Sequence, residues 1–284
     1  MSVMNTLSDL RRLVSGPSLE PGARQARVIA VTARKGGVGK TTTTVNLGAG
    51  LALFHRRKVL LVDMDAQGHV EMSLRAETRG RAPDSLSHVL LHKRRDVHEI
   101  VQPTSIDGLW FVASDPELNR TEGEMASRIG KELLLRHALK LARTHFDVIL
   151  IDCPPNLGSL TVNALVAADQ VLVPCDLSTL SLDGVDALLE TMDTVQETLN
   201  PGIGLLGLLR TRVDRRNQTM NAAIEETLRG RYGTWLLETE IGVSTALPKA
   251  QHVGRPVFLD EEDSRGAHGY RALAAEIDRR LYAS

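Results

Sequence analysis

The chain has 284 residues, a hydrophobic content of 42% and a formal net charge of -1. This length and hydrophobic fraction suffice to bury one large core, as in a single α/β domain. The balanced charge excludes a global field for nucleic acid, and 3% aromatic residues argue against base-stacking platforms. We find no signal peptide and no apolar run of the roughly 18 residues that a bilayer span needs. We therefore expect a cytoplasmic protein with no membrane partner.

Residues 1–26 are predicted to be an N-terminal extension and linker. Val3, Leu7, Leu10 and Val14 recur at helical spacing, and two Gly/Pro breaks at residues 16–22 follow them. The segment fits a short helix on its own domain, a tail that binds a partner protein, or disorder. Residues 27–284 are predicted to form the main domain.

A glycine-rich loop at residues 34–42 organises this domain. It follows a β-branched run at 27–32, which predicts a buried strand, and precedes an apolar-periodic helix at 43–53. In this context glycines let backbone N–H groups point inward as an anion nest, and the helix N-terminus adds its positive dipole. Lys40 would reach the β- and γ-phosphates, and the Thr41 hydroxyl would ligate Mg²⁺. The predicted nucleotide-binding residues are Lys35, Gly36, Gly37, Val38, Gly39, Lys40, Thr41 and Thr42.

The loop departs from the usual phosphate-loop pattern, because Arg34 stands where that pattern has its first glycine. The string K-G-G-x-G-K-T, with a second lysine at Lys35, resembles the ParA/MinD family of P-loop ATPases. The resemblance covers residues 27–281. It implies the cofactors ATP and Mg²⁺, and an ATP-dependent homodimer in which Lys35 reaches the partner's nucleotide.

Two apolar strands are predicted to end in acids. Residues 59–62 precede Asp63 and Asp65, which alternation points the same way, and residues 146–151 precede Asp152 in a Walker B pattern. Carboxyl ends of parallel strands share one sheet edge, where ligands bind. In the related D-x-D-P-Q-G-N motif, which here has Ala66 and His69 in place of Pro and Asn, the second acid orients the attacking water. The resemblance thus makes Lys35, Lys40 and Asp65 catalytic and Thr41, Asp63 and Asp152 metal-binding.

The rest of the chain alternates between predicted strands and helices. Strands are predicted at residues 109–113, 171–174 and 203–209, and helices at 122–144, 181–199, 210–228 and 264–281. This alternation predicts a doubly wound α/β domain with a P-loop NTPase fold and a mainly parallel sheet of about seven or eight strands. Cys153 and Cys175 lie beside strand ends, where free thiols are usually buried.

A local basic surface is predicted at residues 210–231, which hold six arginines and three acids. Such an excess of positive charge suits contacts with nucleic-acid phosphates that do not depend on the base sequence, although an ordinary solvated helix end has the same composition. Arg216 aligns with an arginine that ParA proteins use on nonspecific DNA. The predicted DNA-binding residues are Arg212, Arg215, Arg216, Lys249 and Arg255.

The resemblance implies a slow, partner-stimulated ATPase that dimerises with MgATP and binds nonspecific double-stranded DNA. With a ParB-like adaptor it would position or segregate a chromosome, a plasmid or other cargo, and it would be nucleoid-associated. Three alternatives remain open. A MinD-like membrane ATPase would need a basic amphipathic tail, and only four residues follow Arg280. An electron carrier like the nitrogenase iron protein would need cluster-bridging cysteines. A ligase like dethiobiotin synthetase would ignore DNA.

Overall fold

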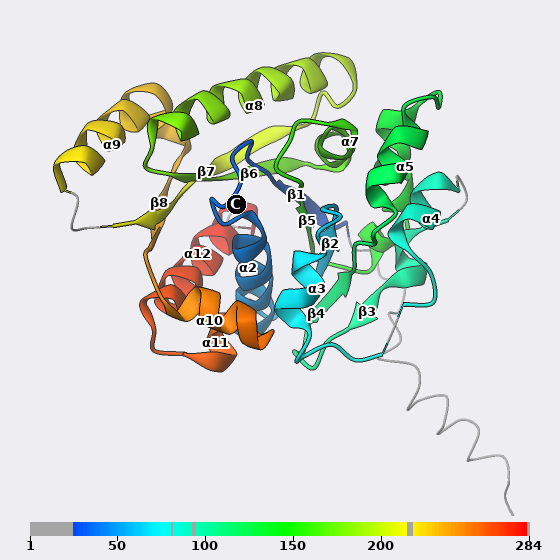
Figure 1. Ribbon diagram of the computed structural model, residues 1–284, viewed down its shortest axis with the longest axis horizontal. Helices are drawn as coiled ribbons and strands as arrows, with labels where there is room; N and C mark the ends of the chain where they lie inside the picture. The colour runs from blue at the N-terminus through cyan, green and yellow to red at the C-terminus, as the bar shows by residue number, and fades with distance from the viewer. Residues whose placement is uncertain (1–24, 81, 93–94, 215–217, 283–284) are drawn as a thin grey trace, which may run out of the picture.

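The computed structural model describes residues 25–80, 82–92, 95–214 and 218–282. Its centre is a sheet of eight strands (Figure 1). The strand order is β3-β4-β2-β5-β1-β6-β7-β8, and every neighbouring pair is parallel except β3 with β4. The strands are β1 Arg27–Val31, β2 Val59–Asp63, β3 Gln102–Pro103, β4 Leu109–Val112, β5 Val148–Asp152, β6 Gln170–Asp176, β7 Gly204–Val213 and β8 Leu236–Gly242. The predicted doubly wound, mainly parallel fold is confirmed.

Helices cover both faces of the sheet (Figure 1). One face carries α2 Lys40–His55, α3 His69–Leu74, α10 Ala246–Val253, α11 Val257–Asp260 and α12 Arg265–Tyr282. The other carries α4 Leu86–Leu91, α5 Leu118–Met125, α6 Leu134–Ala138, α7 Ser159–Ala167, α8 Thr179–Thr198 and α9 Gln218–Tyr232. Short 3₁₀ turns lie at Val97–Ile100, Lys131–Leu133, Ala142–Thr144 and Gly233–Trp235. The predicted extension lies almost wholly outside the described residues.

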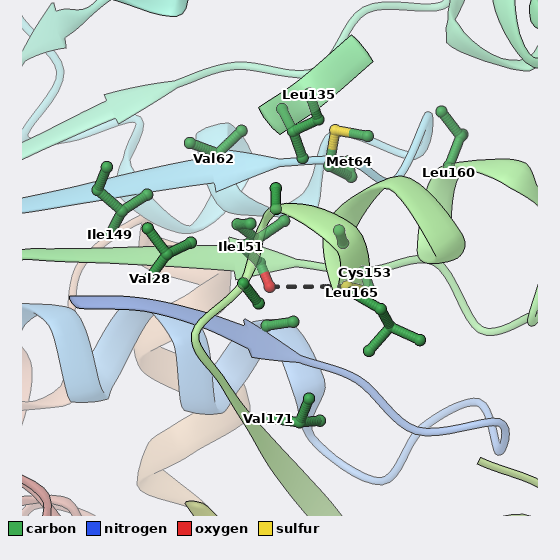
Figure 2. Packing of buried hydrophobic residues seen from close by; sticks show 14 of the residues in the cluster. Val28, Val62, Met64, Leu135, Ile149, Ile151, Cys153, Leu160, Leu165 and Val171 are labelled. Atoms are coloured by element: carbon green, nitrogen blue, oxygen red, sulfur yellow. Dashed lines mark hydrogen bonds between the residues drawn. The ribbon is translucent and has the colours of Figure 1, made fainter. Parts of the chain in front are cut away.

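The two halves of the core follow from strand alternation. Successive side chains of a strand point to opposite faces, so Val28 of β1 packs on the α7 side and Ile29 packs on the α2 side. Figure 2 shows the first of these clusters, which includes Val62, Ile151 and Leu165. Both faces of the central strands are covered, which explains why their sequences read as continuous apolar runs.

The single long helix predicted at residues 122–144 is wrong. Helix α5 ends at Met125, and the chain then proceeds through two 3₁₀ turns and the short α6. Gly130 adopts a left-handed φ of 73°, which a continuous helix cannot contain. Ile129, an apolar residue within the predicted helix, is 97% exposed.

The helix predicted to begin at Arg210 is also wrong at its start. Strand β7 continues to Val213, with Arg210 opposite Cys175 of β6, and α9 begins only at Gln218. Arg210 is 5% exposed and forms ion pairs with Glu225 and Glu240 at 2.8 and 3.2 Å. Arg210 is therefore a buried, ion-paired strand residue, whereas its charge had suggested an exposed position on a helix.

Candidate nucleotide site

The phosphate loop lies at the carboxyl edge of the sheet, between β1 and the N-terminus of α2. Gly39 caps the helix with a left-handed φ of 94° and makes no side-chain cap hydrogen bond. The first turn of α2 contains no acidic residue. A helix start without a side-chain cap leaves its first N–H groups for an anion, as the sequence predicted for a phosphate.

Lys40 is buried at this helix start and is only 8% exposed. Its ammonium donates to the Lys35 carbonyl oxygen at 3.2 Å. Burial lowers the pKa of Lys40, and the nearby Asp152 carboxylate opposes that shift only in part. The Lys40 ammonium is buried and donates to one neutral oxygen, so a bound polyphosphate would supply the negatively charged acceptors that it lacks.

Three oxygen groups meet beside Lys40 in an arrangement that suits Mg²⁺. The Thr41 hydroxyl donates to Asp152 Oδ2 at 2.6 Å, and the Thr44 hydroxyl donates to Asp152 Oδ1 at 3.0 Å. Burial raises the pKa of Asp152 to about 6, although these two hydroxyls stabilise the carboxylate. Hydroxyl and carboxylate oxygens are hard ligands, and Mg²⁺ commonly takes one or two of them together with phosphate oxygens and water. Thr41 and Asp152 would hold the metal ion when the nucleotide is bound.

Asp63 lies at the carboxyl end of β2, close to Asp152. It is fully buried, and its two carboxylate oxygens accept the backbone N–H groups of Asp65 and Val70, both at 3.0 Å. Burial raises the pKa of Asp63, and the neighbouring Asp152 adds to the shift. Both carboxylate oxygens accept backbone hydrogen bonds, so Asp63 anchors the loop that follows β2, and its support of Mg²⁺ through water stays a prediction.

A cavity of about 710 Å³ extends across the site from β2 to β8. At the β2 end, the loop residues from Gly36 to Thr42 face Asp65 and Pro155. Asp65 Oδ1 accepts the Gln67 backbone N–H at 3.1 Å, which fixes the carboxylate in a tight turn. The phosphate loop, Thr41 and Asp65 therefore line one cavity, and Asp152 adjoins it through its hydrogen bond to Thr41.

The sequence did not identify the β8 end of the cavity. It is lined by Thr211, Arg212, Ile241, Gly242, Val243, Ser244, Thr245, Leu247, Pro248, Gln251 and Tyr270. Strand β8 reads Leu-Leu-Glu-Thr-Glu-Ile-Gly, which carries no sequence signature of a ligand-binding wall.

Lys35 turns away from the cavity. Its ammonium donates to Asp176 Oδ2 at 2.6 Å and to the Ser178 hydroxyl at 3.0 Å, and its side chain is 33% exposed. Both partners follow from β6 on the same chain. In this arrangement Lys35 is paired with its own chain and does not face its own phosphate site.

The predicted DNA-binding residues do not form one patch among the described residues. Lys249 pairs with Glu261 at 2.5 Å, and Arg255 pairs with Glu77 at 2.9 Å. Arg212 Nη1 donates to the Gly37 carbonyl oxygen at 3.1 Å, within the nucleotide cavity. Arg215 and Arg216 lie outside the described residues.

Both cysteines are free and buried, as predicted. Burial raises the pKa of both thiols, that of Cys175 to about 12. Cys153 Sγ contacts the Ile151 carbonyl oxygen at 3.8 Å inside the core (Figure 2). Thiols in these positions cannot meet a partner's thiols across a protein surface, which disfavours an iron–sulfur carrier. In the part of the chain that the structure describes, no helix is both long and apolar enough to cross a bilayer.

Known proteins resemble this chain over most of its length. The AAA domain family model matches residues 26–205. The chromosome partitioning protein ParA of Myxococcus xanthus is 37% identical over 261 residues, which cover 91% of this chain and 90% of that protein. The sporulation initiation inhibitor protein Soj of Bacillus subtilis is 38% identical, with coverage of 88% and 98%.

A solved structure of the Mycobacterium smegmatis cobyrinic acid a,c-diamide synthase with ADP and magnesium is 34% identical. It has a TM-score of 0.75 and covers 90% of this chain and 95% of that one. A Cyanothece McdA–ATP complex, at 22% identity and a TM-score of 0.78, shares the fold. Together with the phosphate loop, the Thr41–Asp152 pair and Asp65, these matches establish an ATPase that uses ATP and Mg²⁺, and the chain belongs to the ParA/MinD family of P-loop ATPases.

Proposed function

We propose that this ATPase is a MgATP-dependent dimerising switch that binds nonspecific double-stranded DNA and positions or segregates a chromosome, a plasmid or other cargo. A ParB-like adaptor would stimulate its hydrolysis. The observation that carries the proposal is the separation of two lysines. Lys40 lines the cavity of the candidate nucleotide site, while Lys35, five residues earlier in the same loop, does not line it and is one-third exposed. The proposal is also supported by two relatives, the chromosome partitioning protein ParA of Myxococcus xanthus and the protein Soj of Bacillus subtilis.

Dimerisation would give Lys35 its role. The side chain is one-third exposed and is held by Asp176 and Ser178, so a second subunit can compete for it. A nucleotide polyphosphate carries more negative charge than one carboxylate, and its oxygens are strong hydrogen-bond acceptors. Lys35 would therefore exchange Asp176 for the partner's ATP when two MgATP-loaded subunits meet.

Hydrolysis would proceed by in-line attack of water on the γ-phosphoryl group, which breaks its bond to the β–γ bridging oxygen. Asp65 would orient the water, while Lys40 and the partner subunit's Lys35 would stabilise charge on the phosphate oxygens. Asp63 would hold the Asp65 loop through its two backbone hydrogen bonds. Little covalent chemistry is required of the protein, so the rate depends on how well this loop is ordered.

DNA contact would come mainly from Arg215 and Arg216. The other predicted contact residues already bind groups in their own chain, and Arg229 and Arg231 pair with Glu225 and Asp186. In a dimer the two copies of the Arg215–Arg216 segment would act on one DNA, and the second contact would be intramolecular. The ATP dimer would then bind nonspecific DNA more tightly than the monomer does, and it would associate with the nucleoid.

A DNA-binding titration tests this proposal. Asp65→Ala should bind MgATP without turning it over, and it should retain a DNA duplex in filter binding longer than the wild type. Arg215→Glu with Arg216→Glu should release the duplex and leave the ATP dimer intact. Affinity should fall steeply between 50 and 200 mM salt, because phosphate contacts release counterions. Arg120→Glu is the control, since this arginine is 75% exposed on the distant α5.

The proposal fails if the trapped Asp65→Ala dimer binds DNA no better than the nucleotide-free protein. Two further measurements then separate the alternatives. Pelleting with anionic liposomes in MgATP would indicate a MinD-like membrane ATPase. The Mycobacterium structure is described as a synthase, so ATP turnover that requires a small carboxylic acid and ignores DNA would indicate a ligase.

A further inference from the structure

The end of β7 is fastened to the outer side of the phosphate loop. The Thr211 hydroxyl donates to the Val38 carbonyl oxygen at 2.8 Å, and Arg212 Nη1 donates to the Gly37 carbonyl oxygen at 3.1 Å. Thr211 is only 2% exposed, whereas Arg212 is exposed. Two consecutive side chains thus bind two consecutive carbonyl groups of the phosphate loop.

The Arg212 backbone is also unusual. Its φ is 53°, and among the described residues Arg56 is the only other non-glycine residue with a positive φ. Arg56 follows the C-terminus of α2, where such a conformation is common. Arg212 instead lies at the end of a strand, and a left-handed arginine there costs free energy that the surrounding structure must offset. This conformation places its side chain at the cavity.

The position of Arg212 within the cavity identifies which half of the nucleotide it meets. The phosphate and metal end is set by Lys40, Thr41 and Asp152, beneath β1, β2 and β5. Strands β2 and β5 lie on one side of β1 in the sheet, and β7 lies two strands away on the other side. From β7, Arg212 lines the same cavity, and the end of β8 and the segment that follows it line it beside Arg212 with Gly242, Val243, Ser244, Thr245 and Pro248. A nucleotide that extends from the metal end must place its nucleoside between these walls.

We propose that Arg212 is a nucleotide-binding residue whose guanidinium lies against the adenosine half of ATP. The guanidinium is planar, carries five N–H donors and stacks on aromatic faces. One donor is used on the Gly37 carbonyl oxygen, and the structure gives Arg212 no acidic partner among the described residues. The remaining donors face ribose oxygens or solvent, and the plane of the group covers the base. This replaces the DNA contact predicted for Arg212, and it does not depend on the proposed DNA function.

The position of the contact predicts its effect on affinity. Adenosine is common to ATP and ADP, so loss of the guanidinium should weaken both nucleotides by the same factor. Loss of a cation that stacks on an aromatic ring in a partly desolvated site weakens binding by roughly 3- to 30-fold. A residue that contacted the γ-phosphate would instead weaken ATP much more than ADP.

Isothermal titration calorimetry with ATP and ADP in magnesium buffer tests the assignment. Arg212→Ala and Arg212→Gly should each bind both nucleotides roughly 3- to 30-fold more weakly than the wild type. Arg212→Gly removes the left-handed strain along with the side chain, so it reports on the contact even if the alanine variant folds poorly. Arg229→Ala is the control, because this arginine is 64% exposed, belongs to α9 and pairs with Glu225.

Two results would overturn the assignment. Unchanged affinity for both nucleotides would remove Arg212 from the site, and a loss confined to ATP would make it a γ-phosphate contact. Arg212→Lys separates stacking from charge: it should lose most of the affinity that alanine loses, because an ammonium has no plane. Retention of full affinity by the lysine variant would show that the positive charge alone is used.

Discussion

The ion pair between Lys35 and Asp176 should oppose dimerisation, and Asp176→Asn should therefore tighten the ATP dimer. Lys35 must leave Asp176 before it can reach a partner's phosphates. The asparagine side chain keeps the shape of the aspartate and can still accept one hydrogen bond, but it carries no charge. The substitution thus removes most of the attraction that holds Lys35 on its own chain, while Ser178 remains in place.

The size of the effect follows from the exposure of the pair. The Lys35 and Asp176 side chains are 33% and 18% exposed, and ion pairs near the surface contribute about 0.5–1 kcal/mol. Each dimer contains two Lys35 side chains, so the cost of releasing them is about 1–2 kcal/mol. The dimer dissociation constant should fall by roughly 5- to 30-fold.

Sedimentation equilibrium of the Asp65→Ala protein in MgATP, with and without Asp176→Asn, measures this change. Asp278→Asn is a matched control: Asp278 binds Arg57 at the same 2.6 Å, and its side chain is also 18% exposed, but it lies on α12. The control should leave the dimer unchanged. An unchanged or weaker dimer in Asp176→Asn would refute the competition between the two partners of Lys35.

Three further predictions concern Lys40, Asp63 and Glu276. Lys40→Ala removes the buried ammonium and should weaken ATP at least 10-fold in calorimetry, since hydrogen bonds to charged groups contribute about 1.5–3 kcal/mol; normal affinity would contradict the site. Asp63→Asn should keep MgATP affinity within a few-fold but slow steady-state hydrolysis about 5- to 100-fold, because the Asp65 loop loses an anchor. A loss of Mg²⁺ affinity instead would make Asp63 a metal ligand. Burial tends to raise the pKa of Glu276, but the Thr239 and Glu238 N–H groups at 2.8 and 3.0 Å outweigh it and lower that pKa. Glu276→Gln should therefore cost about 1–3 kcal/mol in urea unfolding at pH 7, and the difference should shrink at pH 4, as protonation removes the advantage of the carboxylate. A difference that did not change with pH would contradict this assignment.

The nucleotide site was largely predictable because each part has a local signature. Glycines, a lysine and a hydroxyl residue between a strand and a helix define the phosphate loop, and an apolar run that ends in Asp152 defines the opposite strand. The rule that parallel strands place their carboxyl ends at one edge then brings these segments together. Asp63 shows the limit of this reasoning, since the sequence gives its place at the strand end but not which N–H groups its oxygens accept.

The helix prediction that failed at Arg210 depended on long-range pairing. Arg210 resembles a surface residue until Glu225 and Glu240 are brought beside it, and these partners lie 15 and 30 residues away. Lys249 and Arg255 also have acidic partners, Glu261 and Glu77, and their DNA contacts stay predictions. A count of charges along the chain cannot distinguish a free cation from a paired one.

The broken helix at residues 122–144 failed for a different reason. Apolar residues at helical spacing persist through the segment, so periodicity alone favours one helix. Gly130 interrupts it with a left-handed backbone, and Ile129 then points to solvent. A single glycine within a periodic run is compatible with a helix at a cost of about 1 kcal/mol, so the sequence did not decide between the two structures.

The central claim is that MgATP joins two subunits and that Lys35 is required for the joining. Light scattering coupled to size exclusion tests it most directly, with the Asp65→Ala protein and its Lys35→Ala double variant at equal concentration. The Asp65→Ala protein should elute as a dimer of about twice the 31.0 kDa chain mass in MgATP and as a monomer with ADP or EDTA. The double variant should bind ATP and remain a monomer throughout. A dimer that forms equally well without Lys35, or one that forms without nucleotide, would contradict the account.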